Sequence, residues 1–265
     1  MPFDQSQASA ISDDRLDIEP VAEVELSIVV PALDEQDNVP LLVEQIEFAT
    51  SGIDSELIII DDGSTDLTLS RLSSLAQTRP WLKVLRHPQT LGQSAAMHTG
   101  IRACRGRFVA TLDADLQNDP IALPEMLEHV RCGTADMVQG DRSLNRQDNI
   151  VRRTGSWVGR QTRRVLLGDP VRDTGCSLRV VRTELARQFP LQFKGMHRFL
   201  PAFAQIIGAR VVEIPVVHRP RSSGRTKYGW GVFNRGLFGL FDCLAVRWMM
   251  KRYRAQETKS EAREA

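Results

Sequence analysis

The 265-residue chain lacks several features that mark common protein classes. No run of 18 apolar residues occurs, so the sequence predicts no membrane-spanning helix. No basic segment followed by an apolar core opens the chain, so we expect no secretory signal. The four cysteines form no CxxC pair and have no histidine at zinc spacing, which favours reduced, cytosolic thiols over a disulfide framework. They are Cys104, Cys132, Cys176 and Cys243.

Glycine-rich phosphate loops are also missing. Neither GxGxxG nor GxxxxGKS/T is present, which argues against a sugar nucleotidyltransferase and against a dinucleotide-dependent dehydrogenase. Internal repeats and low-complexity tracts are absent as well. With 42% hydrophobic and 25% charged residues, the composition is that of an ordinary globular protein, so we expect one catalytic domain with appendages.

The net charge of +1 conceals a strong separation of charge along the chain. Residues 1–24 contain six acids against one arginine, whereas residues 219–254 contain nine Lys or Arg against one acid. We expect the basic end to face phosphate, on a substrate or on a membrane, and we expect no nucleic-acid partner. The predicted divisions are an acidic flexible tail (1–24), a catalytic domain (25–220), a basic loop with an amphipathic interfacial helix (221–252) and a polar tail (253–265).

Apolar runs alternate with segments of helical periodicity from residue 26 onward. The predicted strands of the first half are 26–32, 56–60, 83–86 and a run that begins at Phe108, with helices between them at 39–46, 67–75 and 92–104. This alternation predicts an α/β fold with a Rossmann-like, mostly parallel sheet flanked by helices. Later strands are expected at 135–139, 177–180 and 211–216, and a basic helix at about 150–167.

Acidic residues directly follow the predicted strands. Asp34, Asp62 and the pair Asp113 and Asp115 come at carboxyl ends of strands, where ligands bind in such sheets, so we expect them to line one crevice. Asp113 and Asp115 would point the same way if the backbone stays extended. With the amide oxygen of Gln117 they offer the hard oxygen ligands that Mg²⁺ or Mn²⁺ accepts. An ordinary polar turn after a buried strand is the alternative.

The segment 229–252 differs from the rest of the chain. On a helical projection its large apolar residues fall on one stripe, with Arg235 and Asp242 on the far side. The stripe consists of Trp230, Phe233, Leu237, Leu240, Phe241, Leu244 and Trp248, and Lys251, Arg252 and Arg254 follow it. Such a helix, with Trp near both ends and a basic rim, is typical of a membrane interface. A terminal helix packed on the sheet is the alternative.

Six motifs occur in a fixed order along the chain. They are Val30–Glu35, Ile60–Asp66, Leu91–Ala96, Asp113–Pro120, Gly175–Arg179 and Arg221–Tyr228. In this order, and over roughly residues 25–250, the sequence resembles family 2 inverting glycosyltransferases. It resembles more closely their dolichyl-phosphate mannosyltransferase-like branch, which glycosylates polyprenyl phosphates. The resemblance implies a GT-A fold.

The resemblance also implies roles at the donor site. Positions that hold the nucleotide base and ribose are matched by Pro31, Asp34, Glu35 and Asp62. Asp113 matches the first Asp of the DxD signature, Asp115 its metal-binding Asp, and Gln117 an amide that joins it. The family usually has Asn where this chain has Asp34, which adds a negative charge near the nucleotide.

Basic residues match the family's contacts to phosphate. The matching residues are Arg142 and Arg153 for the acceptor phosphate, and Arg221 and Lys227 for the late loop that closes over the diphosphate. Arginine suits bidentate phosphate contact, and lysine supplies a point charge. Solvated surface charges are expected for Arg160, Arg163 and Arg164. His197, next to Arg198, is expected to be a structural histidine.

The function implied is metal-dependent, inverting transfer of a sugar from a nucleotide-diphosphate sugar to an undecaprenyl or dolichyl phosphate. A phosphate monoester is largely dianionic at neutral pH, since its second pKa is about 6, so the acceptor serves as its own nucleophile. The alternatives are a saccharide or protein acceptor, or a non-catalytic nucleotide-sugar-binding subunit of a membrane complex. We expect peripheral attachment at the cytoplasmic face of a membrane, directly or through a small transmembrane partner subunit.

Overall fold

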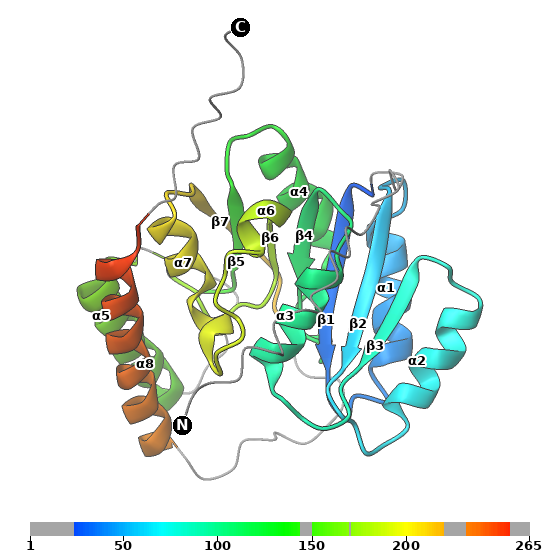
Figure 1. The fold of residues 1–265 in the computed structure, drawn as a ribbon, viewed down its shortest axis with the longest axis horizontal. Helices are drawn as coiled ribbons and strands as arrows, with labels where there is room; N and C mark the ends of the chain where they lie inside the picture. Colours follow the sequence, from blue (N-terminus) through cyan, green and yellow to red (C-terminus); the bar gives the residue numbers. More distant parts are fainter. Residues whose placement is uncertain (1–23, 144–149, 170, 220–231, 255–265) are drawn as a thin grey trace, which may run out of the picture.

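The computed structural model describes residues 24–143, 150–169, 171–219 and 232–254, with the backbone alone described for 150–158 and 232–238 (Figure 1). Predicted phosphate contacts Arg221 and Lys227 lie outside these residues, and the side chain of Arg153 is not described. Val24, which the predicted divisions place in the acidic tail, is buried, and its carbonyl accepts a hydrogen bond from the Arg107 N–H at 3.0 Å.

A seven-stranded sheet forms the centre of the described structure, in the order β3-β2-β1-β4-β6-β5-β7. The strands are β1 Leu26–Ala32, β2 Ser55–Asp61, β3 Leu82–Arg86, β4 Phe108–Thr111, β5 Met137–Asp141, β6 Arg179–Arg182 and β7 Val211–Pro215. All pairings are parallel except those of β6, which runs antiparallel to β4 and β5. The predicted mostly parallel sheet is therefore confirmed, and one reversed strand interrupts it.

Helices cover both faces of the sheet (Figure 1). One face carries α1 Val39–Ala49, α2 Thr68–Gln77, the short η1 Pro120–Ala122 and α4 Leu123–Arg131. The other carries α3 Gln93–Ala103, α6 Thr183–Ala186, η2 Met196–Phe199 and α7 Leu200–Ile206. The long helices α5 Ile150–Leu167 and α8 Val232–Arg252 lie side by side at one flank of the molecule. The result is a three-layer α/β/α arrangement with an added helical pair.

The side chains of β1 alternate between the two faces of the sheet and contribute to a hydrophobic core on each face. Ile28 and Val30 of β1 are fully buried against α1, whereas Val29 between them is fully buried against α3. The helix α3 packs very close to the sheet, because a Cβ added to Gly100 would come within 2.4 Å of the Val29 Cγ1 atom. A larger side chain there would displace Val29 or Ile60, so the glycine permits the close approach of α3 to the sheet.

The helix α8 differs from the prediction of one apolar stripe. Four members of the predicted stripe are 41–60% exposed, namely Leu240, Phe241, Leu244 and Trp248. The opposite side is apolar as well, since Cys243 and Val246 are buried in the core. The helix is therefore apolar on two sides, and its predicted amphipathic character is not confirmed. Within the described ranges, we find no helix with the length and apolar content needed to span a membrane.

Candidate active site

The loops that follow β1 and β2 are joined by Asp34. The backbone of Asp34 has a φ of 47°, a left-handed conformation that Asp and Asn adopt more readily than most residues. Its Oδ1 accepts hydrogen bonds from the Thr65 backbone N–H at 2.8 Å and the Thr65 hydroxyl at 3.3 Å, while its own N–H donates to Ser64 Oγ at 2.9 Å. An asparagine Oδ1 accepts the same bonds. The departure from the family's Asn thus keeps the geometry and adds only charge.

Asp62, after β2, holds the loop that leads into α3. Its carboxylate accepts hydrogen bonds from the backbone N–H groups of Leu91 at 3.0 Å and Gly92 at 2.8 Å. The same carboxylate contacts His87 Nδ1 at 2.7 Å, and the other ring nitrogen of His87 lies 2.9 Å from the Thr99 hydroxyl. Asp62 therefore organises the start of α3, and its nucleotide contact stays a prediction.

The two other residues predicted at the nucleotide lie in the same region. Pro31 lies in β1 opposite Ile60 of β2. Glu35 lies between β1 and α1, where its N–H donates to Thr68 Oγ1 at 2.8 Å and its carboxylate accepts from Asn38 Nδ2 at 2.6 Å. Both positions are compatible with a ligand at the carboxyl edge, and neither contact tests the predicted role.

Asp113 and Asp115 lie in a turn after β4 rather than in an extended strand, because Leu116 next to them has a φ of 60°. Asp113 Oδ1 accepts a hydrogen bond from Gln93 Nε2 at 2.6 Å, and its backbone N–H donates to Ser177 Oγ at 3.1 Å. Asp115 is buried, and its Oδ1 accepts from the Gln117 N–H at 3.2 Å. Burial, and then the charge of Asp115, raise the pKa of Asp113.

This carboxylate pair suits a hard divalent cation. A cation placed between two acids favours their ionised forms, which burial and mutual repulsion disfavour. Within the part of the chain that the structure describes, no three His, Cys, Asp or Glu side chains gather to hold a metal. An ion at this edge would therefore use Asp113, Asp115 and neutral oxygens such as the Gln117 amide, together with oxygens of a bound diphosphate.

Arg142, the predicted acceptor contact after β5, is engaged in a buried ion pair. Its Nε donates to Asp173 Oδ2 at 2.7 Å and its Nη2 to Oδ1 at 3.1 Å, with side chains 11% and 4% exposed. Arg179 in β6 is also buried, donating from Nε to Gln139 Oε1 at 2.6 Å and from Nη2 to the Thr174 carbonyl at 3.1 Å. The positive charges of both arginines act to lower the pKa of Asp113, but the effect of burial is larger and the pKa stays raised.

The segment after β7 contacts the carboxylate loop. The Arg219 N–H donates to the Gln117 carbonyl at 2.9 Å, and Asn118 forms an isolated antiparallel bridge with His218. The Arg219 guanidinium forms an ion pair with Asp119. The chain that enters the predicted basic loop therefore starts beside Gln117.

A hollow of about 350 Å³ opens beside Asp113. It is lined by Gln93, Asp113, Arg163, Thr174, Gly175, Ser177, Arg179, His197 and Arg198. Among the predicted site residues whose side chains are described, only Asp113 lines it. Asp34, Asp62 and Asp115 do not, so the predicted single crevice is only partly formed. Arg163, expected to be a surface charge, lines the hollow and is partly buried, whereas Arg164 beside it is exposed.

His197 is held in the wall of this hollow. Its Nδ1 lies 2.7 Å from Ser94 Oγ at the start of α3. Burial, and then the charges of Arg198 and Arg179, lower the pKa of His197 to about 3. The imidazole is therefore neutral at physiological pH and a weak base, which agrees with the expected structural histidine.

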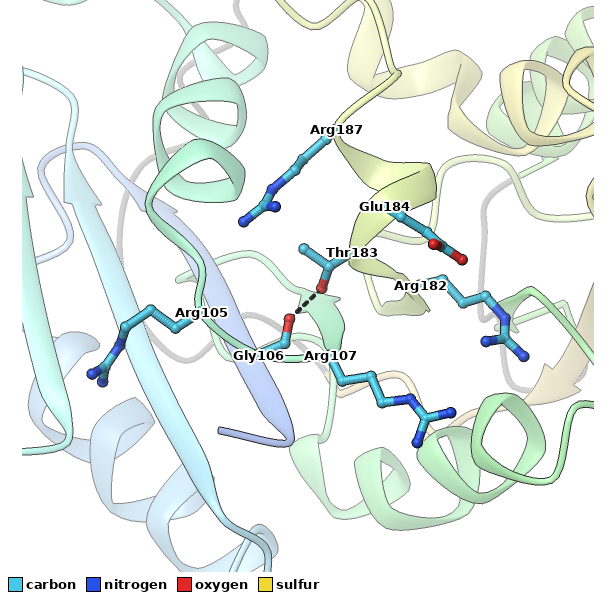
Figure 2. A pocket seen from close by; sticks show the side chains of 7 residues that line it. All are labelled: Arg105, Gly106, Arg107, Arg182, Thr183, Glu184 and Arg187. Carbon is cyan, nitrogen blue, oxygen red and sulfur yellow. Dashed lines mark hydrogen bonds between the residues drawn. The ribbon is translucent and has the colours of Figure 1, made fainter. Parts of the chain in front are cut away.

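A second hollow, of about 390 Å³, lies at the opposite edge of the sheet, where β4 begins and β6 ends. The Thr183 hydroxyl donates to the Gly106 carbonyl at 2.6 Å in its wall (Figure 2). Figure 2 shows Arg105 pointing to one side of this hollow, and Arg107 and Arg182 pointing to the other. These three guanidinium groups diverge, so they do not converge on one ligand.

Comparison with known proteins identifies the family. The sequence profile described as Glycosyl transferase family 2 matches residues 27–189, which include β1 to β6 and both predicted carboxylates. This chain belongs to glycosyl transferase family 2. The glycosyltransferase shares its fold with glucosyl-3-phosphoglycerate synthase of Mycobacterium tuberculosis, solved with Mn²⁺, UDP and glucosyl-3-phosphoglycerate, at a TM-score of 0.65 and 19% identity over 88% of this chain and 81% of that one. The GT-A expectation is thereby confirmed.

Two curated relatives show where the glycosyltransferase falls in the family. It is 36% identical to the dodecaprenyl-phosphate galacturonate synthase of Rhizobium johnstonii, over 90% of this chain and 70% of the relative. It is 31% identical to the undecaprenyl-phosphate 4-deoxy-4-formamido-L-arabinose transferase of Photorhabdus laumondii, over 83% of this chain and 68% of the relative. Both relatives are named as enzymes that attach a sugar to a polyprenyl phosphate, which agrees with the branch of the family predicted from the motifs.

Several contacts of the glycosyltransferase site escape prediction from the sequence. Gln93, Ser177 and Arg179 belong to recognised motifs, but no sequence pattern shows that they gather around Asp113. Asp173 has no local signal, because its partner Arg142 lies 31 residues away. Burial raises the pKa of the nearby Cys176 thiol to about 11, so this cysteine stays protonated and is no nucleophile.

Proposed function

We propose that this glycosyltransferase moves a sugar from a nucleotide-diphosphate sugar to a polyprenyl phosphate. The observation that carries the proposal is the hollow beside Asp113. An acceptor hydroxyl needs a general base with a pKa near the working pH. Among the described residues that line the hollow, the only carboxylate is Asp113, which belongs to the proposed cation site, and the only histidine is a weak base. A phosphate acceptor needs no base, because it is already ionised.

The roles assigned to the residues follow from this acceptor. A divalent cation, Mg²⁺ or Mn²⁺, would be held by Asp113, Asp115 and Gln117 and would supply charge compensation for the departing diphosphate. Asp34, Glu35, Asp62 and Pro31 are proposed to frame the nucleotide at the ends of β1 and β2. Arg142, Arg153, Arg221 and Lys227 are proposed to position the acceptor phosphate and the diphosphate.

The test is a measurement of nucleotide-diphosphate release from UDP- and GDP-sugars, with and without Mg²⁺ or Mn²⁺ and a polyprenyl phosphate. We expect release from one donor that requires both the metal and the lipid phosphate. Asp115→Ala should lower the rate by about a hundredfold to a thousandfold, the effect of losing one preorganised electrostatic group. Glu184→Gln, at the opposite edge, is the matched control and should retain full activity.

Two results would contradict the proposed reaction. If the protein releases nucleotide diphosphate only with a saccharide acceptor, or if Asp115→Ala keeps its activity with polyprenyl phosphate, the proposed reaction is wrong. Binding of a nucleotide sugar without turnover of any donor would instead favour a non-catalytic subunit.

We also propose peripheral attachment to a membrane through α8, directly or with a small transmembrane partner. Exposed Phe241 and Trp248 lie on the same helix as the basic residues Arg247, Lys251 and Arg252. Phe241→Ser with Trp248→Ser should weaken sedimentation with vesicles of anionic phospholipid roughly tenfold or more, because each removes large apolar area from the interface. Phe48→Ser, which changes a 75% exposed phenylalanine on α1, is the matched control. Equal sedimentation of all three proteins would exclude α8 as the attachment site.

A further inference from the structure

Two arginines in the hollow beside Asp113 have no ionic partner among the residues that the structure describes. Arg163 comes from α5 and Arg198 from η2, 35 residues later, and both line the hollow that contains Asp113. Among the described residues, neither side chain forms an ion pair or a hydrogen bond with a carboxylate. Asp169 and Asp242 influence these arginines only at longer range. The two guanidinium groups therefore remain available to an anionic group of a ligand.

The two other described arginines beside Asp113, Arg142 and Arg179, already have protein partners. Arg142 has two of its donors on Asp173, and Arg179 is bonded to Gln139 and Thr174. Burial lowers the pKa of Arg163, so an anion beside it would offset part of the cost of burying its charge. A planar guanidinium matches a carboxylate through two parallel N–H···O bonds.

The donor's diphosphate does not account for these arginines. Under the proposed function, its charge is balanced at Asp113 and Asp115 by a divalent cation. The proposed function assigns the acceptor phosphate to other basic residues, Arg142, Arg153, Arg221 and Lys227. The donor sugar is the remaining group of the reaction next to Asp113, and a carboxylate on it would pair with partly buried Arg163 and exposed Arg198.

We propose that the donor sugar carries a carboxylate, as a hexuronate does, and that Arg163 and Arg198 bind this carboxylate. The proposal rests on the proposed function and names the class of its donor. It also separates the two curated relatives, because galacturonate is anionic whereas 4-deoxy-4-formamido-L-arabinose has no carboxylate, and the chain is more similar to the galacturonate synthase.

The experiment compares matched donor pairs with the full-length protein: UDP-galacturonate with UDP-galactose, UDP-glucuronate with UDP-glucose, and GDP-mannuronate with GDP-mannose. Binding is measured by calorimetry with Mg²⁺ and without acceptor, so the result does not depend on turnover. We expect one uronate donor to bind about tenfold to a hundredfold more tightly than its neutral partner, as charge-assisted hydrogen bonds to a carboxylate provide. If no uronate donor binds better than its neutral counterpart, the proposal is overturned.

Variants then assign the preference to the two arginines. Arg163→Gln and Arg198→Gln should each reduce the uronate preference by about tenfold and leave binding of the neutral donor unchanged. Arg164→Gln, an exposed neighbour on α5, is the matched control and should keep the preference. A preference that survives in both variants would contradict the assignment.

Transfer to undecaprenyl phosphate distinguishes this inference from the proposed function. If a neutral sugar is transferred and the uronate is not, the proposed function stands and the inference fails. If Arg163→Gln and Arg198→Gln raise the KM for the lipid phosphate and leave the donor ratio unchanged, the arginines hold the acceptor phosphate instead. If the uronate binds preferentially but the lipid phosphate never accepts it, the inference stands and the proposed acceptor is wrong.

Discussion

The two ends of β5 each carry a bidentate arginine–aspartate pair, and the two pairs differ in burial and in that Asp136 has a second arginine, Arg182, at 3.3 Å. At the carboxyl end, Arg142 and Asp173 are 11% and 4% exposed. At the amino end, Arg210 and Asp136 are 59% and 22% exposed, with contacts of 3.1 and 3.2 Å that are nearly as short. Water screens the charges of Arg210 and Asp136. The buried charges of Arg142 and Asp173 have little contact with water and are stabilised by each other.

The same contrast holds at the two ends of the β4–β6 ladder. At one end, Asp113, Ser177 and Gln93 gather beside a hollow that is also lined by Arg163, Arg179 and Arg198. At the other end, the arginines around the second hollow diverge. Buried charge is therefore concentrated at the edge where the parallel strands end, and each removed charge there has a larger effect on stability or activity.

The largest expected effect comes from breaking the buried pair of β5. Arg142→Gln removes the bidentate cation from buried Asp173, so the free energy of unfolding should fall by about 3–5 kcal/mol. Arg210→Gln at the exposed pair should leave the urea midpoint close to that of the wild type. Equal losses in the two variants would contradict the comparison.

A double variant separates stability from chemistry at the same pair. Arg142→Gln with Asp173→Asn removes both charges and should recover most of the lost stability, because no uncompensated charge stays buried. If Arg142 also positions the acceptor phosphate, activity should remain low in the double variant. Full recovery of activity would restrict Arg142 to a structural role.

A smaller effect of opposite sign is expected at Asp113. Folding raises the pKa of this carboxyl, so its ionised form destabilises the folded protein. This loss of stability develops as the pH rises through the folded pKa. Asp113→Asn should raise the melting temperature at pH 7 by about 2–4 °C, as a change near 1 kcal/mol does in a domain of this size. Mg²⁺ or Mn²⁺ should raise the melting temperature of the wild type and not that of the variant. A lower melting temperature in Asp113→Asn would contradict the pKa direction.

The smallest effect near neutral pH is expected at His197. Its folded pKa of about 3 lies below the ordinary 6.5, so folding favours the neutral ring, and stability is lost as the pH falls from 6.5 towards 3. His197→Asn should flatten the fall of the urea midpoint between pH 6.5 and 4. Ser94→Ala should lower the midpoint similarly at each pH, because burial and not this hydrogen bond is the main cause of the shift. An unchanged slope in His197→Asn would contradict the assignment.

The sequence predicted the helices and strands well and the tertiary contacts between them less well. Continuous apolar runs such as β1 and β2 mark buried strands, and the helix predicted at 92–104 corresponds to α3. The direction of β6 was not predictable, because apolar periodicity is the same for a parallel and an antiparallel strand. This reversed strand is what brings Ser177, just before it, beside Asp113.

Contacts between residues far apart in the sequence were also not predictable, because local periodicity does not specify them. Nothing in the local pattern around Arg163 distinguishes it from Arg164, yet one lines the hollow and the other is exposed. The two residues lie about 100° apart around the axis of α5. Which of them faces the hollow depends on how the helix packs. The exposed apolar side of α8 was expected from its periodicity, whereas its buried side at Cys243 and Val246 was not.

The bridge between Asn118 and His218 also has a consequence for the order of folding. Contacts that join residues a hundred positions apart form late, because closing a long loop costs entropy before the contact repays it. During synthesis, β1 to β4 emerge from the ribosome well before His218 and Arg219 do. The carboxylate loop therefore acquires its last hydrogen bonds only after β7 has been made, so a truncated or nascent chain that already has its nucleotide half lacks a finished cation site.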